Sequence, residues 1–375
     1  MSETAKAAVL ARANGDFVVQ EMATPDVGPR EILLRTELAG VCASDAHIAQ
    51  GHLEGFPYPS ILGHEFVGTI ARLGSAMTED MVGQPVRVGD RIIVMPAIAC
   101  GHCYFCVVEG MPSRCEHIEA YGFYDAVAYP LRGGWGQYVH LANPRTRFVK
   151  TELAPEVAVL LEPFCTPIQG INRIGVRLGD TALVQGSGSV GLLMVVAARA
   201  AGAQRIIVVG APRRRLDVAR ELGADVTIDL EEIQDSAERV RLVRAETVGR
   251  RGVDVAFECA GVPSAITEGL ACLRNSGRYC ELGHFTDTGD LTLNPHRDMV
   301  RSNLTLIGSN GYEASDFIEG LRILERGDYP FERIVSHRLP LDKAGDAVAA
   351  LTTRGLRLDG VEVCKIALDP WQGAR

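Results

Sequence analysis

The chain has 375 residues, of which 47% are hydrophobic and 23% are charged, and its formal net charge is −9. This length suits about two domains, and the composition is that of a globular protein able to bury a sizeable core. The acidic balance argues against a nucleic-acid surface, which requires concentrated positive charge, so we expect no nucleic-acid partner.

The N-terminal residues 1–13 lack the basic stretch followed by an apolar block that marks a secretory signal. The longest apolar runs, such as residues 192–198, are too short to span a bilayer, so we expect no membrane partner. Ten cysteines without a signal indicate thiols in a reducing compartment, used for metal binding or chemistry. These features together predict a cytoplasmic protein.

The first quarter of the chain is expected to be rich in β-strands. Short apolar or alternating runs occur at residues 7–10, 17–19, 31–36, 66–70 and 92–94. Proline and glycine separate these runs, which is the pattern of short strands joined by turns. The polar, cysteine-rich segment of residues 100–115 has little periodicity and predicts a lobe or loop.

From about residue 178 the pattern changes to alternating strands and helices. Strands are predicted at residues 181–185, 205–209, 225–228, 253–257, 277–282 and 304–307, and helices at 190–201, 214–222 and 314–326. Strands that alternate with helices form βαβ units around a parallel sheet. A further strand is predicted in the tail at residues 361–366.

A glycine-rich turn joins the first of these strands to the first of these helices. The first glycine of such a turn bends the chain, the second lets the backbone approach a pyrophosphate, and the third lets the helix pack on the strand. Backbone amides at the helix start then meet the phosphates. We expect dinucleotide binding by Gly186, Gly188, Ser189, Val190 and Gly191. The alternative is a glycine-rich turn without a ligand.

The end of the next strand bears on the choice between NAD and NADP. NAD-binding folds carry an acidic residue here that contacts the ribose hydroxyls, whereas this chain has Gly210. The loop after it offers Arg213, Arg214 and Arg215, and a guanidinium can pair with a 2′-phosphate through two hydrogen bonds. We therefore expect NADP more than NAD. The arginines could also form a solvated helix start, so NAD stays open.

Four cysteines lie close together in the chain, at Cys100, Cys103, Cys106 and Cys115. Four thiolates at this density complete the tetrahedral shell of a structural zinc with no open position. Redox-active or unrelated thiols are the alternative, but three evenly spaced cysteines are uncommon by chance. We expect a structural zinc in this lobe.

A second set of metal ligands is dispersed along the chain. Cys42, His64 and Glu65 precede the cysteine lobe, and Glu162 follows it. A cysteine, a histidine and a carboxylate form an open catalytic zinc site, in which water or substrate takes the remaining position. Alone, each of these residues would be ordinary: a buried cysteine, a structural histidine or a solvated glutamate.

Together these motifs resemble the zinc-dependent medium-chain alcohol dehydrogenase family. The matching elements are Gly40-Val41-Cys42-x-Ser44-Asp45, Gly63-His64-Glu65-x-x-Gly68, Val88-Gly89-Asp90-Arg91, the four-cysteine lobe and the glycine turn. Their order and spacing agree over nearly the whole chain. The Glu162-Pro163 pair is similar to the polyol and threonine dehydrogenase branch of that family.

The resemblance implies a catalytic zinc site with residues in defined roles. Cys42 and His64 would bind the zinc, with Glu162 as a third ligand or a water-bridged neighbour. Glu65 would ligate or exchange with water. Asp45 would accept a hydrogen bond from the far nitrogen of His64 and so fix its ring.

The resemblance also implies a proton relay and two zinc ions per chain, one catalytic and one structural. Zinc lowers the pKa of a bound oxygen acid by many units, so an alkoxide can form near neutral pH and expel a hydride to the nicotinamide. Ser44 would take the proton of the substrate hydroxyl and pass it, through the cofactor ribose, toward His47 and solvent. Family members are commonly homodimers or homotetramers.

The sequence gives less information about the substrate than about the metal and cofactor sites. Aromatic residues that flank the motifs are candidates for the walls of a pocket: Phe56, Tyr58, Tyr121, Phe123, Tyr124, Trp135 and Phe164. His284 and Phe285 follow a strand end that would meet the nicotinamide. We expect a secondary or cyclic alcohol, with a polyol as the next choice.

Two other functions are compatible with this fold. A non-catalytic, redox-responsive module that binds NADPH and zinc would be expected to have lost Cys42, Ser44 or His64, and all three are present. A zinc-free quinone or enoyl reductase would lack both the cysteine lobe and the dispersed ligand set. The sequence therefore favours an alcohol dehydrogenase.

The expected fold class is α/β. A GroES-like, β-rich catalytic domain of residues 1–164 and 306–375 would be combined with a Rossmann domain, a doubly wound parallel sheet, of residues 165–305. Cys165 lies near Glu162 in the chain, but we interpret it as a small buried residue and not as a metal ligand.

Overall fold

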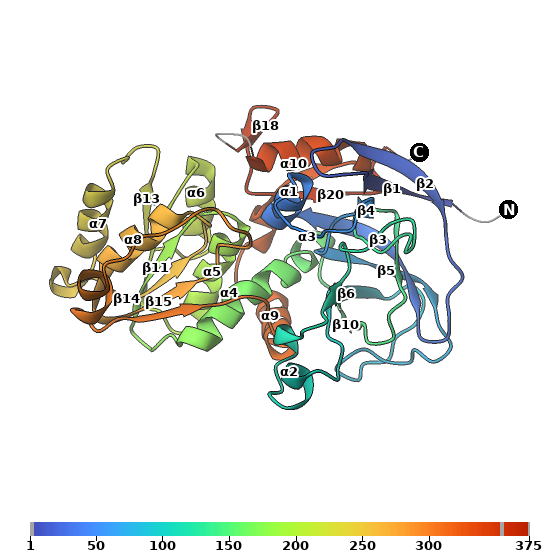
Figure 1. The fold of residues 1–375 in the computed structure, drawn as a ribbon, viewed down its shortest axis with the longest axis horizontal. Coiled ribbons are helices and arrows are strands. Elements are labelled where there is room, and N and C mark those ends of the chain that lie inside the picture. The colour runs from blue at the N-terminus through green and yellow to red at the C-terminus, as the bar shows by residue number, and fades with distance from the viewer. Residues whose placement is uncertain (1–3, 353–355, 374–375) are drawn as a thin grey trace. The chain divides into compact units, whose positions relative to one another are not determined.

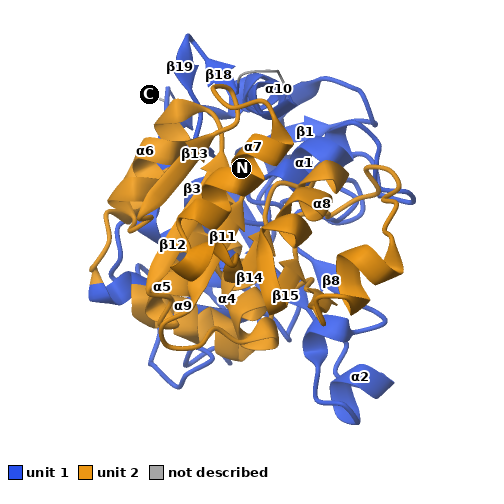
Figure 2. Cartoon of the chain, turned by 90° about the vertical axis from the view of Figure 1, so that its left-hand side faces the viewer, with its two compact units in different colours: residues 1–162, 324–326, 335–375 blue, residues 163–323, 327–334 orange. Residues whose placement is uncertain are grey.

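The computed structural model describes residues 4–352 and 356–373. The contacts within the chain define two compact units (Figure 2). Unit 1 comprises residues 1–162, 324–326 and 335–375, and unit 2 comprises residues 163–323 and 327–334. Each unit is described by itself below.

Unit 1 is built mainly on antiparallel strands, several of which are labelled in Figure 1. Its largest sheet has the order β10 (Arg147–Lys150), β6 (Arg91–Met95), β5 (Phe66–Leu73), β3 (Ile32–Val41), β20 (Lys365–Leu368) and β17 (Val335–Leu339). Strand β9 (Tyr138–Leu141) also pairs with β3. A smaller sheet has the order β2 (Phe17–Ala23), β1 (Thr4–Leu10) and β4 (Ser60–Ile61). Apolar side chains of these strands form one core, which includes the fully buried Trp135 and Tyr121.

Short helices and two-stranded ribbons complete unit 1. The helices are α1 (Ala43–Ala49), α2 (Tyr104–Val107), α3 (Pro155–Ala158) and α10 (Ala344–Thr352). The ribbons are β7 (Ala97–Ile98) with β8 (Glu119–Ala120), and β18 (Arg357–Leu358) with β19 (Val361–Glu362). The first ribbon encloses the cysteine lobe predicted from the sequence, because β7 and β8 lie on either side of residues 100–115.

Unit 2 contains a six-stranded sheet in which every neighbouring pair is parallel. Its order is β13 (Val226–Asp229), β12 (Arg205–Gly210), β11 (Thr181–Gln185), β14 (Val253–Glu258), β15 (Leu273–Glu281) and β16 (Thr305–Gly308). The connecting helices are α5 (Ser189–Ala200), α6 (Arg213–Glu221), α7 (Ser236–Ala245) and α8 (Pro263–Cys272). This is the strand order of a Rossmann sheet, which confirms the predicted fold class.

The last strand of the parallel sheet lies beyond the domain boundary expected at residue 305. Strand β16 begins at Thr305 and pairs with β15, so the segment that follows it belongs to unit 2 as far as residue 323. Two helices carry the chain across the division between the units: α4 (Leu161–Ile174) and α9 (Ala314–Arg326). A short terminal strand is hard to assign from sequence, because its apolar run looks the same in either domain.

Helices in the described part of the chain are too short or too polar to cross a membrane. Within the described residues, the ten cysteines form no disulfide bond.

Candidate active site

Helix α1 and the residue before it hold the first candidate ligand in a fixed conformation. Cys42 is the N-cap of α1, and its backbone N–H donates to Oδ2 of Asp45 at 2.9 Å. This is a capping-box arrangement, in which the carboxylate at the third helical position satisfies the N-cap amide. Asp45 is buried, so its other oxygen is directed into the protein. The spacing Cys42-x-x-Asp45 therefore positions both side chains.

His64 lies after β4 and faces Asp45. The Nδ1 atom of His64 is 3.6 Å from Oδ1 of Asp45, and neither atom has another hydrogen-bond partner among the described residues. The other ring nitrogen, Nε2, is 3.4 Å from Oγ of Ser44. A carboxylate on Nδ1 leaves Nε2 as the nitrogen that can bind a metal. The two ring nitrogens are thus arranged as the sequence predicts for a ligand backed by Asp45.

Ligand atoms of Cys42, His64 and Glu65 all lie within 4.8 Å of one another. Burial alone would lower the pKa of His64, but Asp45, the Cys42 side chain and Glu162 raise it well above its usual value. A buried set of anionic groups therefore favours positive charge at this point of unit 1. A zinc ion would supply that charge, and the donor set of one sulfur, one imidazole and carboxylates fits it.

Lys365 is a residue of this cluster that sequence reasoning missed. Its Nζ lies 2.5 Å from Oε2 of Glu65, and both side chains are 1% exposed. Burial lowers the pKa of Lys365, but Glu65, Cys42 and Glu162 outweigh this and raise it. Gly40 is needed beside this pair, because a Cβ atom there would overlap the Glu65 carboxylate.

Glu162 is in the first turn of α4 and acts on the pKa of both His64 and Lys365. It belongs to unit 1, whereas Cys165, three residues later, belongs to unit 2 and is fully buried. Among the described residues, the groups whose ligand atoms converge do not include Cys165. The structure thus places two carboxylates, Glu65 and Glu162, in the electrostatic surroundings of His64.

The four sulfurs of the cysteine lobe also converge. Sγ of Cys103 is 3.5 Å from that of Cys106 and 3.9 Å from that of Cys115. A tetrahedral zinc with Zn–S bonds of about 2.3 Å places its sulfurs about 3.8 Å apart. The spacing in the lobe therefore fits a zinc bound by four thiolates.

Backbone amides in the lobe donate to the thiolate sulfurs. The N–H groups of Cys100 and His117 donate to Sγ of Cys115 at 3.1 and 3.3 Å, and that of Cys103 donates to Sγ of Cys100 at 3.3 Å. The pKa of Cys103 is lowered to about 6, mainly because the backbone N–H of Glu116 donates a hydrogen bond to its sulfur. Such bonds favour the ionised sulfur, which is the form that binds zinc.

The aromatic candidates for a substrate pocket divide into two groups. Tyr121, Trp135 and Phe164 are fully buried and belong to the core. By contrast, the Phe123 ring is 5.9 Å from that of His64, and Phe56 lies 5.6 Å from Phe123. Aromatic surface thus lies directly beside a candidate zinc ligand.

The glycine turn of unit 2 has the close backbone contacts expected of a dinucleotide site. Gly186 has φ +99°, and a Cβ there would lie 2.9 Å from the backbone nitrogen of Ala260. A Cβ on Gly191 would overlap the carbonyl oxygen of Gly186, so this glycine lets α5 pack on the turn. Gly188 is the N-cap of α5. Each glycine therefore has the position that the motif assigns to it.

Gly210 has a packing role that the sequence did not show. A Cβ at this position would overlap Oγ of Ser187, which itself donates to the carbonyl oxygen of Ala211 at 2.9 Å. The glycine thus lets the end of β12 lie against the glycine turn. Its presence is explained by packing, whichever cofactor binds.

The three arginines after β12 differ in their surroundings. Arg213 is exposed and pairs with Asp217 at 3.2 Å and Glu232 at 3.5 Å. Arg215 is buried, and its Nη1 would lie 3.8 Å from a Cβ on Gly188, so it is beside the glycine turn. Arg214 is partly exposed on the first turn of α6.

A third convergent group lies where β14 and β15 end, and sequence reasoning had noted only His284. Nδ1 of His284 is 2.8 Å from Oε1 of Glu281, while the N–H groups of Ala260 and Gly261 donate to Glu258. Burial, together with the charge of Glu281, raises the pKa of Glu258 to about 7. Because both oxygens of Glu258 and Oε1 of Glu281 already accept hydrogen bonds from backbone N–H groups, we interpret the group as a hydrogen-bonded cluster and not as a metal site.

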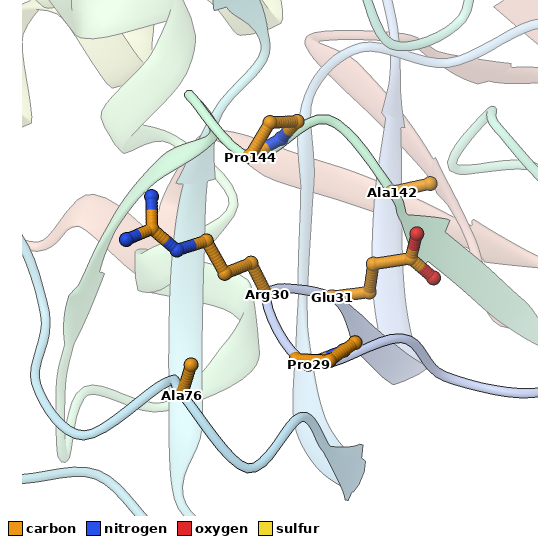
Figure 3. A pocket seen from close by; sticks show the side chains of 6 residues that line it. All are labelled: Pro29, Arg30, Glu31, Ala76, Ala142 and Pro144. Atoms are coloured by element: carbon orange, nitrogen blue, oxygen red, sulfur yellow. The ribbon is translucent and has the colours of Figure 1, made fainter.

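Unit 1 also contains a pocket on a different part of its surface, shown in Figure 3. Its lining residues are Pro29, Arg30, Glu31, Ala76, Ala142 and Pro144. The candidate ligands described above do not line it, and it carries no convergent set of reactive side chains.

Comparison with known proteins agrees with this geometry. Residues 28–152 match the alcohol dehydrogenase GroES-like domain family, and residues 189–326 match the zinc-binding dehydrogenase family. The chain is 34% identical to 5-exo-hydroxycamphor dehydrogenase of Pseudomonas putida, over 92% of this chain and 94% of that protein. It is 30% identical to sorbitol dehydrogenase of Bacillus subtilis, over 92% of both chains. A solved alcohol dehydrogenase of Thermotoga maritima has a TM-score of 0.90 and 30% identity, covering 98% of this chain and 99% of its own.

Proposed function

Because this chain belongs to the zinc-dependent medium-chain alcohol dehydrogenase family, in its polyol and threonine dehydrogenase branch, we propose that it interconverts a secondary alcohol and its ketone. The reaction transfers a hydride between the alcohol carbon and a nicotinamide cofactor. The observation that carries the proposal is the convergence of Cys42, His64 and Glu65 within 4.8 Å, with Asp45 behind His64.

The chemistry requires a Lewis acid, a hydride acceptor and a route for one proton. Bound zinc supplies the Lewis acid, which lowers the pKa of an alcohol and polarises a carbonyl. Cys42 and His64 would hold it, and Asp45 would keep the His64 ring oriented. Ser44 is buried, with its Oγ beside His64, so it can accept the proton of the substrate hydroxyl. His47, one turn along α1, is only partly buried and can release a proton toward water.

The third zinc ligand is assigned to Glu162, with Glu65 as the carboxylate that exchanges. Glu65 is neutralised by Lys365 at 2.5 Å, which weakens its attraction for a cation. Glu162 acts on the pKa of His64 from the first turn of α4. Glu162→Gln should therefore lower zinc affinity more than Glu65→Gln, measured by competition with a chelator. The reverse order would assign Glu65 as the resident ligand.

The proposed substrate is a secondary alcohol with an apolar, cyclic body, with a polyol as the next choice. Phe123 presents aromatic surface beside His64, and the buried Phe56 packs against Phe123, which favours contact with hydrocarbon over contact with hydroxyl groups. A relative acts on a hydroxycamphor and another on sorbitol, so both substrate classes occur among similar proteins.

The proposed cofactor is NADP more than NAD. Gly210 leaves the end of β12 without a carboxylate, so a 2′-phosphate would meet no repulsion from that position. Arg214, partly exposed at the start of α6, and Arg215, beside the glycine turn, are the guanidinium groups that we assign to the phosphate. Arg213, the third arginine of this segment, is exposed and pairs with Asp217 and Glu232.

The proposal is tested by measuring kcat/KM for cyclic secondary alcohols and polyols, each with NAD and NADP, on protein of known metal content. We expect two zinc ions per chain and the highest value for a cyclic alcohol with NADP. The non-catalytic module would bind dinucleotide without turnover, and a quinone or enoyl reductase would reduce its substrates with the zinc removed. Either result would overturn the proposal.

Cofactor preference needs its own variants, because Gly210→Asp would place a side chain against Ser187 and disturb the turn. Arg214→Ala is the better substitution, with Arg220→Ala on the same helix as a control that lies away from the turn. We expect Arg214→Ala to lower kcat/KM with NADP about tenfold or more and to leave that with NAD nearly unchanged. Equal effects on the two cofactors would contradict the assignment.

We also propose a homodimer or homotetramer in the cytoplasm, as is common in this family. Light scattering of the purified protein and fractionation of the cells that express it would test these two statements.

A further inference from the structure

Helix α1 ends in a motif that places a second histidine against His47. Gln50 is the last residue with helical backbone angles, and Gly51 follows with φ +78°. The N–H of Gly51 donates to the carbonyl of Ile48, and the N–H of His52 donates to that of His47, both at 2.9 Å. These two hydrogen bonds define a Schellman motif, which brings the side chains of His47 and His52 together.

The side chains in contact here are two imidazoles, where such motifs usually have two apolar groups. Nδ1 of His47 is 3.2 Å from Nδ1 of His52, and their ring centroids are 5.5 Å apart. A hydrogen bond between two Nδ1 atoms contains one proton, so one ring donates and the other accepts. His47 is partly buried, whereas His52 is exposed. The pair therefore joins an inner imidazole to one in water.

We propose that His52 is the outer residue of the proton relay, which takes the proton from His47 and releases it to water. This inference rests on the proposed function, in which Ser44 and His47 carry the proton of the substrate alcohol. The sequence motif ends at His47 and does not point to His52, which lies in the loop after α1. Only the Schellman turn brings the two side chains together.

The transfer is balanced in protons and leaves the charge of the pair unchanged. A proton that arrives at Nε2 of His47 makes this ring an imidazolium. The Nδ1 proton of His47 then passes along the hydrogen bond to Nδ1 of His52, and His52 loses its Nε2 proton to water. Exchange of ring protons with water, at the partly buried His47 as well as at the exposed His52, then restores the first tautomers of both rings. In the direction of carbonyl reduction the same steps run inward.

The surroundings of the pair favour this direction of release. Burial and the neighbouring His52 both lower the pKa of His47, so His47 does not retain a proton that it receives. Tyr58 donates its hydroxyl to the carbonyl oxygen of Ile48 at 2.6 Å, and this neutral side chain adds no charge beside the imidazoles. Helix α10 packs against α1, and its acidic residue Asp346 is paired with Lys343 at 2.8 Å.

The test compares His52→Gln, which can still hydrogen-bond to His47 but cannot carry a proton, with His52→Ala. His296→Gln, an exposed histidine of unit 2, is the matched control. Stopped-flow measurement with a pH-indicator dye follows proton release in the first turnover, and absorbance of the reduced cofactor follows hydride transfer. We expect both His52 variants to release protons about tenfold more slowly near pH 6.5, with the difference shrinking at pH 9, where hydroxide takes the proton directly. Added imidazole should restore the rate of His52→Ala.

A second measurement does not depend on turnover. In ¹⁵N spectra of histidine-labelled protein, His52→Gln should raise the pKa of His47, because His52 lowers it in the wild type. Zinc content and cofactor affinity should stay unchanged in every variant.

Three outcomes would overturn the inference, and they are distinguishable. If the wild type oxidises alcohols and both His52 variants release protons at its rate, or if His52→Ala is slow and does not respond to imidazole, His52 is not a relay residue. If the zinc-loaded wild type reduces no cofactor with any alcohol, the proposed function fails and the relay fails with it.

Discussion

The two candidate zinc sites of unit 1 are built from similar ligands but differ in how their charge is balanced. In the cysteine lobe, four sulfurs lie close together and backbone N–H groups donate to them. In the Cys42–His64 site, two carboxylates surround one sulfur and one imidazole, and the buried Lys365 pairs with one of them. Four thiolates would leave no position for substrate in the lobe, whereas in the second site we propose that a carboxylate exchanges. Stability is therefore expected to depend on the first site and turnover on the second.

The largest effect on activity is expected from substitution of a ligand in the Cys42–His64 site. Cys42→Ser should lower kcat/KM for alcohol oxidation at least about a thousandfold, because the Lewis acid contributes several kcal/mol to the transition state. Zinc content should fall from two per chain to one, while dinucleotide affinity stays near the wild-type value. Cys165→Ser is the control, since this buried thiol is not expected to bind metal, and it should keep both zinc ions. Normal turnover by Cys42→Ser would disprove the catalytic zinc assignment.

Substitution of a ligand in the cysteine lobe should lower stability much more than turnover. Cys106→Ser is expected to lose the structural zinc and to destabilise the lobe by several kcal/mol, because metal binding and folding of such a lobe are coupled. Limited proteolysis within residues 100–115 would detect the change, together with a lower midpoint of thermal unfolding. The kcat of the remaining folded protein should fall far less than in Cys42→Ser. Equal losses of activity in the two variants would mean that the sites are not separate in function.

Lys365 offers a way to sharpen the comparison. Lys365→Met leaves the carboxylate of Glu65 buried without its partner, which should cost about 3–5 kcal/mol in the zinc-free protein. The double variant Lys365→Met with Glu65→Gln should recover much of this loss, because the unpaired charge is then gone. Zinc should stabilise the single variant more than the wild type, as measured by the shift in thermal midpoint on adding metal. A single variant as stable as the wild type would show that the ion pair is unimportant.

The side chains that converge at the two candidate sites could be singled out from the sequence, but the groups around them could not. Cys42, Asp45 and His64 are recognisable because a helix start and a short loop fix their positions locally. Lys365 reaches Glu65 only because β20 pairs with β3, so that Ile366 lies opposite Val41. Sequence patterns give strands but not which distant strands are neighbours.

Cofactor choice shows a related limit. The glycine turn and its helix could be recognised from their order in the chain, and the structure gives Gly186 and Gly191 close backbone contacts. Gly210 was interpreted only as the absence of a carboxylate, although its contact with Ser187 also requires a glycine. A missing side chain has a chemical and a steric explanation, and only the three-dimensional neighbours reveal the second.

The smallest effect concerns the carboxyl ends of β14 and β15, where the buried Glu258 lies close to the charge of Glu281. Burial and the charge of Glu281 raise the pKa of Glu258 from 4.5 to about 7. A carboxyl group with a raised pKa in the folded state is stabilising below pH 4.5, and this contribution is lost as the pH rises through about 7. The loss is on the order of 3 kcal/mol.

Glu258→Gln removes the titration, so its thermal midpoint should fall less than that of the wild type between pH 5 and pH 8. Glu325→Gln, an exposed change on α9, should follow the wild type. A Glu258→Gln profile parallel to the wild type would show that this carboxyl titrates alike in the folded and unfolded chain.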